Sequence, residues 1–260
     1  MTSRFVFCMK WGTRYGPEYV NGLYRSVMRH TPKPPRFVCF TDNSDGFDAG
    51  IEVFPLPLQD IPGTEDLRWR KLGVFQSDLF GLKGRAIFLD LDTVVTGDLT
   101  PLFEYDKPFA VLHEQTLFPD ARLKMLRRRL FKPLRYRWAQ RECNTSVFAF
   151  NIGECGFILD RYLTNPLHFN TQYRREQEFV ARELALRNML HYWPASWCVS
   201  FLENCLQPGE HGRMGKRHLP ADARVVVFVS GMDMEWAQAN SSKISRTPAD
   251  LAWLAEYWNG

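Results

Sequence analysis

The sequence predicts an α/β protein built on an open, mostly parallel β-sheet with helices against its faces. Short apolar runs of strand length alternate with segments of helical periodicity through the first hundred residues. Three of these runs end directly in polar or aromatic residues. The composition agrees, because 45% hydrophobic and 24% charged residues over 260 positions are typical of a globular protein with a sizeable core.

The first half of the chain carries the clearest elements. Pro17 begins the first predicted helix, because proline is favoured in a first turn and apolar residues then recur every three or four positions up to Met28. A second helical stretch is predicted around residues 69–82. The predicted strands of this half cover residues 4–9, 37–40, 51–54 and 86–89.

The second half is more mixed. We predict strands at residues 109–112, 146–150 and 225–229, a long helix over residues 174–190, and a terminal helix that begins near Thr247. There is no internal repeat and no clean linker, so we expect one domain over residues 1–260, with a soft boundary near residue 115.

Compartment and redox state are predicted from what the sequence lacks. No apolar run approaches the roughly 20 residues that span a bilayer. The first eleven residues do not resemble a signal peptide. The six cysteines show no Cys-x-x-Cys pair and no zinc spacing, and Cys8 and Cys39 lie in apolar runs. We therefore expect a cytoplasmic protein with free thiols.

Polar groups at three strand ends predict a binding crevice. Lys10-Trp11, Thr41-Asp42 and Asp90-Leu91-Asp92 each follow an apolar strand. Ligands of open α/β sheets bind beyond the carboxyl ends of the strands. We therefore expect these three segments to face one crevice.

Asp90 and Asp92 are the strongest candidates for metal ligands. Residues i and i+2 of a regular strand point to opposite faces, but a strand that breaks into a turn can turn both carboxylates toward one cation. Mg²⁺ and Mn²⁺ favour one or two carboxylates together with phosphate oxygens. Such a metal neutralises the charge that develops on a leaving diphosphate.

These segments resemble the GT-A glycosyltransferases, and family 8 and its uncharacterised bacterial relatives most of all. The resemblance extends over most of residues 4–236 and is most specific in the metal segment. The residues that carry it are Trp69-Arg70-Lys71-Leu72, Arg85 to Val95, Lys10-Trp11-Gly12 with residues 15–21, Phe37 to Asp42, and Asn144 to Phe148.

The resemblance implies a GT-A type, Rossmann-like mixed sheet flanked by helices, with a C-terminal acceptor-side region. It implies a glycosyltransferase that moves a sugar from a nucleoside-diphosphate sugar to a glycan or lipid-linked acceptor, with Mn²⁺ or Mg²⁺ and with retention of anomeric configuration. Residues 1–115 would then be the nucleotide-binding half, and residues 116–260 the acceptor and sugar half.

The same resemblance implies roles for individual residues. Asp90 and Asp92 bind the metal, and Asp90 also touches the ribose. The nucleoside lies against Lys10, Trp11 and Tyr15, with Asp42 at the next strand end. Lys71 and Arg70 face the diphosphate or the donor sugar. Asn144 and Ser146 line the sugar pocket, and Gln177 lies near the reacting centre beside Glu176 in a charged helical segment.

The sequence departs from the family 8 pattern near its C-terminus. Many members carry a His-Phe-x-Gly-x-x-Lys-Pro-Trp type of segment, whose His binds the metal and whose Lys binds phosphate. Here the corresponding segment runs from Phe228 to Trp236 and lacks both residues. Asp233 is the nearest oxygen ligand in it. A non-catalytic nucleotide-binding remnant is therefore one alternative function.

A phosphatase of the haloacid-dehalogenase type is the other alternative. The run Phe88 to Val95 also matches the Asp-x-Asp motif of those enzymes, with Asp90 as nucleophile and Asp92 as acid-base. In those enzymes the motif lies near the start of the chain, and a downstream Gly-Asp-x-x-x-Asp pair is needed; neither holds here.

One segment concentrates the positive charge. Residues 122–141 contain nine Lys or Arg and no acid, while the rest of the chain carries 24 basic against 29 acidic residues. Leucines recur in it every three or four positions. The pattern predicts either a basic amphipathic helix that contacts an anionic membrane at its inner face, or a solvated helix packed on the core. No nucleic-acid motif accompanies the charge.

Overall fold

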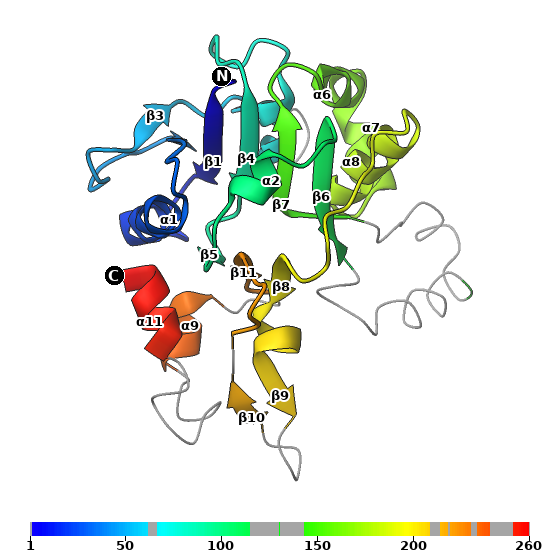
Figure 1. Ribbon diagram of the computed structural model, residues 1–260. Helices are drawn as coiled ribbons and strands as arrows, with labels where there is room; N and C mark the ends of the chain where they lie inside the picture. Colours follow the sequence, from blue (N-terminus) through cyan, green and yellow to red (C-terminus); the bar gives the residue numbers. More distant parts are fainter. Residues whose placement is uncertain are drawn as a thin grey trace.

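The computed structural model describes residues 2–61, 67–114, 130, 143–208, 214–217, 219–229, 233–239 and 252–259. Its main feature is a six-stranded mixed sheet in the order β3-β2-β1-β4-β7-β6 (Figure 1). The strands are β1 (Arg4–Lys10), β2 (Arg36–Thr41), β3 (Glu52–Phe54), β4 (Arg85–Leu89), β6 (Phe109–His113) and β7 (Cys143–Asn151). All run parallel except β7, which is antiparallel to both of its neighbours.

Both faces of this sheet are buried. Along β1, Val6 and Cys8 belong to the apolar cluster on one face, and Phe5, Phe7 and Met9 belong to the cluster on the other. Successive strand residues point to opposite faces, so continuous apolar runs are what a doubly covered sheet requires. The strands are therefore predictable from the sequence.

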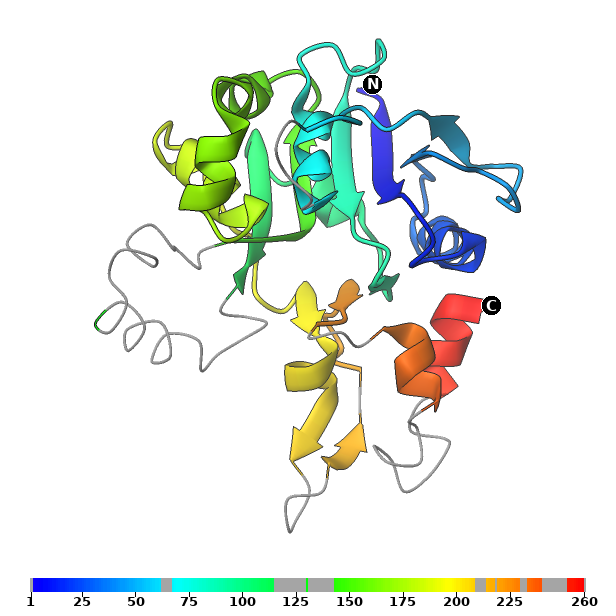
Figure 2. The same ribbon diagram turned by 180° about the vertical axis from the view of Figure 1, so that it is seen from behind.

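Helices cover the two faces unequally. The helix α1 (Pro17–His30) packs on one face, and its partner is the C-terminal helix α11 (Ala252–Asn259). The other face carries the 3₁₀ helix η1 (Leu67–Phe75), which packs against α6 (Gly156–Leu163) and α8 (Glu176–Ala185). Figure 2, seen from behind, shows η1 in front of the strands. The remaining helices are α2 (Thr100–Phe103), α7 (Pro166–Gln172) and α9 (Met234–Ala239).

A smaller sheet lies beyond the carboxyl ends of β1 and β4 (Figure 1). It has the order β5-β11-β8, from β5 (Thr93–Val95), β11 (Val225–Val227) and β8 (Cys198–Ser200). The single-turn π-helix η2 (Phe201–Cys205) leads from it to the β9 (Leu206–Pro208) and β10 (Met214–Arg217) pair. The strand β5 begins at the residue after Asp92, so the turn at Asp90–Asp92 connects the main sheet to this second sheet.

Two helices are shorter than the sequence predicts. The helix expected at 69–82 is a 3₁₀ helix over Leu67–Phe75. It could not have reached residue 82, because Phe80 and Gly81 take positive φ values of 53° and 70°, which no right-handed helix can continue. The helix expected at 174–190 is α8. Arg175 before it is extended, and Asn188 after it has φ 57°.

Among the described strands of the main sheet, only β7 runs against its neighbours, so the sheet is mostly parallel, as the sequence predicts. Residue pattern alone does not encode strand direction. The chain reaches β7 after leaving β6 at the same edge of the sheet, so the two strands run antiparallel. The result is the mixed sheet that the family resemblance implies.

Several predictions fall on residues that the structure does not describe. The basic segment 122–141 lies outside them except for Leu130, as do residue 115 and Thr247. Among the described helices, none has the length and apolarity to cross a bilayer. All six cysteines are buried and none is joined to another in a disulfide, and the burial of Cys8 and Cys39 agrees with the apolar runs in which they lie.

Candidate functional site

A cavity of about 690 Å³ opens at the carboxyl ends of β1 and β4, where the sequence predicts a crevice. Nine of the twelve predicted site residues line it. These are Lys10, Trp11, Tyr15, Lys71, Asp90, Asp92, Asn144, Ser146 and Gln177. Three predicted residues, Asp42, Arg70 and Asp233, do not line it.

The Asp90–Asp92 turn is fixed by backbone contacts. The backbone N–H of Asp90 donates to the carbonyl of Ser146 at 2.9 Å, and the Thr93 hydroxyl donates to the carbonyl of Asp90 at 2.7 Å. The carbonyl of Asp92 accepts from the backbone N–H of Phe228 at 3.0 Å. The strand thus breaks between β4 and β5, and both carboxylates border the same cavity.

The side chain of Lys71, on η1, reaches this turn with its ammonium group. Its Nζ lies 2.6 Å from Oδ1 of Asp90 and donates to the carbonyl of Thr145 at 3.2 Å. The residue is buried, at 8% exposure, and is not the surface residue of a solvated helix. A buried lysine needs such partners, because an unpaired buried charge is strongly unfavourable.

Electrostatic interactions across the turn shift two pKa values. Burial, followed by the neighbouring Asp90 charge, raises the pKa of Asp92 to about 7. Burial by itself would lower the pKa of Lys71, but the carboxylates of Asp90, Glu176 and Asp92 together outweigh it and hold this pKa above its ordinary value. The raised pKa keeps Lys71 in its charged form at neutral pH, whereas Asp92 is divided between its protonated and ionised forms there.

A β-bulge aims three residues of β7 at the site. The register between β6 and β7 shifts after Val111, where Leu112 pairs with Asn144. The Asn144 side chain accepts from the backbone N–H of Ser146 at 2.9 Å. Within this irregular stretch, the Thr145 carbonyl accepts from the Lys71 ammonium and the Ser146 carbonyl accepts from the backbone N–H of Asp90.

The loop after β1 forms another wall. Lys10 ends the strand and is buried, Trp11 is half-buried, and Gly12 turns the chain with φ 61°. Asp42 lies outside the cavity, and its Oδ2 accepts from the backbone N–H of Gly12 at 2.9 Å. Asp42 thus holds the loop in place from the neighbouring strand end.

Tyr15 lies farther along that loop, where several acids converge. Burial raises the pKa of its hydroxyl, and the charges of Asp92, Asp233 and Asp90 raise it further. Its ring packs on Tyr19 with centroids 4.7 Å apart. The Arg14 guanidinium lies 5.0 Å from the Tyr15 ring centre, so a cation accompanies the aromatic wall.

Glu176 and Gln177 are buried at the start of α8, although the charged sequence around them favours a solvated face. The Thr145 hydroxyl donates to Oε1 of Glu176 at 3.0 Å, and the Cys143 thiol donates to the Gln177 carbonyl at 3.2 Å. Both residues line the cavity. The first turn of α8 is therefore part of the site wall.

The donor set at the turn fits a divalent cation. Asp90 and Asp92 offer hard carboxylate oxygens at one cavity wall. Burial and, after it, the neighbouring Asp90 charge make the ionised form of Asp92 unfavourable, and a bound cation would offset both effects. No cluster of three potential ligands from His, Cys, Asp and Glu exists among the described residues. The two aspartates would hold the ion with water or substrate oxygens completing its shell.

The three predicted residues outside the cavity have other surroundings. The Asp233 carboxylate accepts from the backbone N–H of Trp236 at 2.8 Å, at the start of α9. Its charge contributes to the raised pKa values of Tyr15 and Tyr19. Arg70 is half-buried on η1, next to Lys71.

Phe228, in the place where family 8 members carry their His, lines the cavity and stacks on Phe201 with centroids 4.5 Å apart.

Four charged residues of the cavity were missed by the sequence reasoning. These are Arg14, Arg68, Glu114 and Arg175. Glu114 directly follows β6, so the strand-end argument could have found it. Arg14, Arg68 and Arg175 lie in loops or at element ends, and no local pattern marks them.

Comparisons with known proteins give similarity in structure alone. No family model and no curated protein sequence matches the chain. The galactosyltransferase LgtC, in complex with donor and acceptor sugar analogues, matches with a TM-score of 0.56 at 12% identity, over 96% of this chain and 99% of that one. The bifunctional glycosyltransferase WbbM matches with a TM-score of 0.60 at 11% identity, over 100% of this chain and 52% of that one.

The glycosyltransferase GlyE of Streptococcus pneumoniae TIGR4 matches with a TM-score of 0.53 at 14% identity, over 89% of this chain and 56% of its own. At identities this low, similarity in structure establishes the arrangement of the elements, and the activity has to be argued from the site. The chain thus has the fold of the GT-A-like glycosyltransferases, as its sequence resemblance predicts.

Proposed function

We propose that the protein transfers a sugar from a nucleoside-diphosphate sugar to a glycan or lipid-linked acceptor. The observation that carries this proposal is the grouping of Asp90, Asp92 and the buried Lys71 on one cavity wall, at the carboxyl edge of a glycosyltransferase-type sheet. Two acids for a cation and one fixed ammonium suit a substrate whose leaving group is a diphosphate.

Asp90 and Asp92 would hold Mn²⁺ or Mg²⁺. When bound, such an ion neutralises negative charge on a leaving diphosphate. Metal binding requires the ionised form of Asp92. Burial and the neighbouring Asp90 charge make that form unfavourable in the metal-free protein. Asp233 lies near enough to act on Tyr15 and serves in this proposal as an outer carboxylate.

Lys71 supplies a fixed positive charge to the diphosphate. Its ammonium is oriented by Asp90 and the Thr145 carbonyl, so it needs no rearrangement to act. Fixed charges in a partly dehydrated site stabilise a charged transition state better than mobile solvent does. Arg70, the neighbour of Lys71 on η1, would support the positive potential from outside the cavity.

The loop after β1 would bind the nucleoside. Trp11 offers a ring face at the cavity wall, Lys10 a cation and Tyr15 a hydroxyl. Asp42 would act as a positioning residue, because its contact is with the Gly12 backbone.

The opposite wall would bind the transferred sugar. Asn144 and Ser146 border the cavity on the β7 bulge, and Gln177 borders it on α8. An amide and a hydroxyl can each donate to and accept from sugar hydroxyls. We infer retention of anomeric configuration from the likeness to family 8, with residues 1–115 as the nucleotide half and residues 116–260 as the acceptor half of one domain.

A thermal-shift screen of nucleoside diphosphates with and without Mn²⁺ tests the binding side of this proposal. A ligand that binds only the folded state raises the midpoint by mass action. We expect one nucleotide to raise it in a Mn²⁺-dependent manner, and Asp92→Ala to remove the dependence. No shift with any nucleotide, or an unchanged Mn²⁺ effect in the variant, would overturn the proposal.

The two alternatives predict different outcomes in solution. A nucleotide-binding remnant gives the thermal shift but no release of diphosphate from any donor. A phosphatase of the haloacid-dehalogenase type turns over an aryl phosphate and loses that activity in Asp90→Asn. The structural similarities give this phosphatase interpretation no support.

A further inference from the structure

The candidate site contains more positive charge than the proposed function assigns to named roles. The basic residues that line its cavity are Lys10, Arg14, Arg68, Lys71 and Arg175. Lys71 is bound to Asp90 and to the Thr145 carbonyl. Arg68 and Arg175 have other interactions within the chain. Arg14 remains as a cation of the cavity wall that has no role so far.

Arg14 lies on the loop after β1, where a ligand can reach it. Its side chain is exposed and lines the cavity. Its guanidinium lies 5.0 Å from the Tyr15 ring centre, within the range of cation–π attraction. Tyr15 packs in turn on the buried Tyr19, with ring centroids 4.7 Å apart. The two rings therefore give an otherwise mobile type of side chain a preferred position at the cavity wall.

The charge of Arg14 also acts on the Asp90–Asp92 turn. Burial and then the Asp90 charge raise the pKa of Asp92, whereas Lys71 and Arg14 are among the groups that oppose this rise. Electrostatic effects weaken with distance, so Arg14 lies near the Asp92 carboxylate. Lys71 reaches the same turn from η1. A ligand bound at the turn therefore faces cations from two separate elements.

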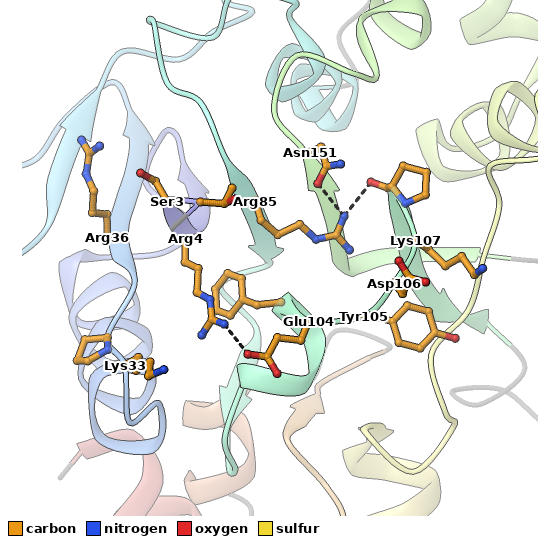
Figure 3. A pocket seen from close by; sticks show the side chains of 14 residues that line it. Ser3, Arg4, Lys33, Arg36, Arg85, Glu104, Tyr105, Asp106, Lys107 and Asn151 are labelled. Carbon is orange, nitrogen blue, oxygen red and sulfur yellow. Dashed lines mark hydrogen bonds and ion pairs between the residues drawn. The ribbon is translucent and has the colours of Figure 1, made fainter.

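The larger cavity of the molecule, of about 930 Å³, provides a contrast. It lies where β1 and β4 begin, and it shares no lining residue with the candidate site. Its arginines contact the chain itself, as Figure 3 shows: Nη2 of Arg4 binds Glu104 at 2.7 Å, and Nη1 of Arg85 donates to the Pro108 carbonyl at 2.9 Å. Those arginines hold the sheet edge together. Arg14 has no hydrogen bond or ion pair of this kind with any described residue.

We propose that Arg14 binds the diphosphate of the donor, through two parallel N–H bonds of its guanidinium that donate to phosphate oxygens. The planar guanidinium matches two oxygens of a phosphate, which a lysine ammonium does not. The Tyr15 ring holds the guanidinium in position beside the Asp90–Asp92 turn. Lys71 and Arg14 then contact the leaving group from different sides. This inference rests on the proposed function, because it adds a binding residue to the same site.

Calorimetric titration of the full chain with UDP, GDP, CDP, ADP and dTDP, each with Mn²⁺, first identifies the nucleoside diphosphate that binds tightest. The corresponding nucleoside is then measured by displacement of that diphosphate. The variants are Arg14→Gln and Arg14→Lys. Arg36→Gln is the matched control, because Arg36 is an exposed arginine that lines only the other cavity.

We expect Arg14→Gln to weaken diphosphate binding about tenfold or more, and nucleoside binding less than about twofold, because only the phosphate contacts are lost. Arg14→Lys should recover part of the loss, since it keeps the charge without the paired donors. Arg36→Gln should bind both ligands as the wild type does. The unfolding midpoint of Arg14→Gln without ligand should equal that of the wild type, because Arg14 is exposed.

Equal diphosphate affinity in the wild type and Arg14→Gln would overturn the role of Arg14 and leave the proposed function intact. An equal loss for nucleoside and diphosphate would also overturn it, because Arg14 would then contact the base or ribose. Full recovery in Arg14→Lys would contradict the paired hydrogen bonds. A wild type that binds none of the five diphosphates would overturn the proposed function together with this inference.

Discussion

The Nζ of Lys71 lies 2.6 Å from Oδ1 of Asp90, so the first carboxylate of the Asp-x-Asp turn is already paired with a buried cation. The pairing joins η1, on one face of the sheet, to the break between β4 and β5. It also explains why a lysine can be buried here, since the Asp90, Glu176 and Asp92 charges all stabilise its ammonium.

Lys71→Met should reduce release of nucleoside diphosphate from the donor by about 100-fold or more, because a fixed cation near the leaving group is lost. Steady-state kinetics with the donor found by screening would measure the effect. The matched control is Lys83→Met, which changes an exposed lysine away from both cavities. An unchanged kcat in Lys71→Met would exclude this lysine from the reaction.

Binding of Mn²⁺ should depend on pH across the neutral range. The pKa of Asp92 is about 7 in the metal-free protein, and a metal binds the ionised carboxylate. Affinity should therefore fall about tenfold for each pH unit below about 6 and level off above 8. Calorimetry in two buffers of different ionisation enthalpy would detect the released proton. A flat affinity between pH 5 and 8 would contradict the raised pKa.

Asp92→Asn should stabilise the metal-free protein at pH 8 but have little effect at pH 4. The folded-state pKa of Asp92 lies above its value of 3.8 in the unfolded chain, so the folded state binds the proton more tightly. Wild-type stability from this group therefore falls as pH rises from about 4 to 7, and asparagine has no such loss. We expect a gain of about 1–3 kcal/mol in the free energy of unfolding at pH 8.

Chemical denaturation at both pH values would measure this gain. Asp60→Asn provides the matched control, because Asp60 is exposed and lies away from the turn. Equal stability of wild type and Asp92→Asn at pH 8 would show that Asp92 ionises without difficulty in the folded protein.

Phe228→His should tighten Mn²⁺ binding while it weakens the fold. The residue lines the cavity, and its backbone N–H contacts the Asp92 carbonyl, so an imidazole there adds a nitrogen ligand beside the two carboxylates. We expect about tenfold tighter binding. Loss of the Phe201 stack should cost about 2 kcal/mol or more of stability. An affinity no higher than that of the wild type would show that this position cannot supply the missing ligand.

The sequence predicts the part of the site that strand ends create. Lys10, Asp90 and Asp92 follow apolar runs directly, and the end of a buried parallel strand is local information. The same argument extends to Glu114, which follows β6.

Contacts between segments that are distant in the sequence could not be predicted from it. The run around Glu176 reads as a solvated charged face, yet its side chain is buried because the Thr145 hydroxyl, on a different element, donates to it. Lys71 is buried for the same kind of reason. Asp42 stands at a strand end as predicted, but its carboxylate turns to the Gly12 backbone and not into the cavity. Side-chain direction there is set by a neighbouring loop, which no periodicity records.

Release of nucleoside diphosphate from a panel of nucleotide sugars, with Mn²⁺ present, tests the central claim most directly. The wild type should hydrolyse or transfer at least one donor, and Asp90→Asn and Asp92→Asn should each lose about 100-fold or more of that activity. Absence of release from every donor, in a protein that still binds a nucleoside diphosphate, would contradict sugar transfer and identify a binding remnant instead.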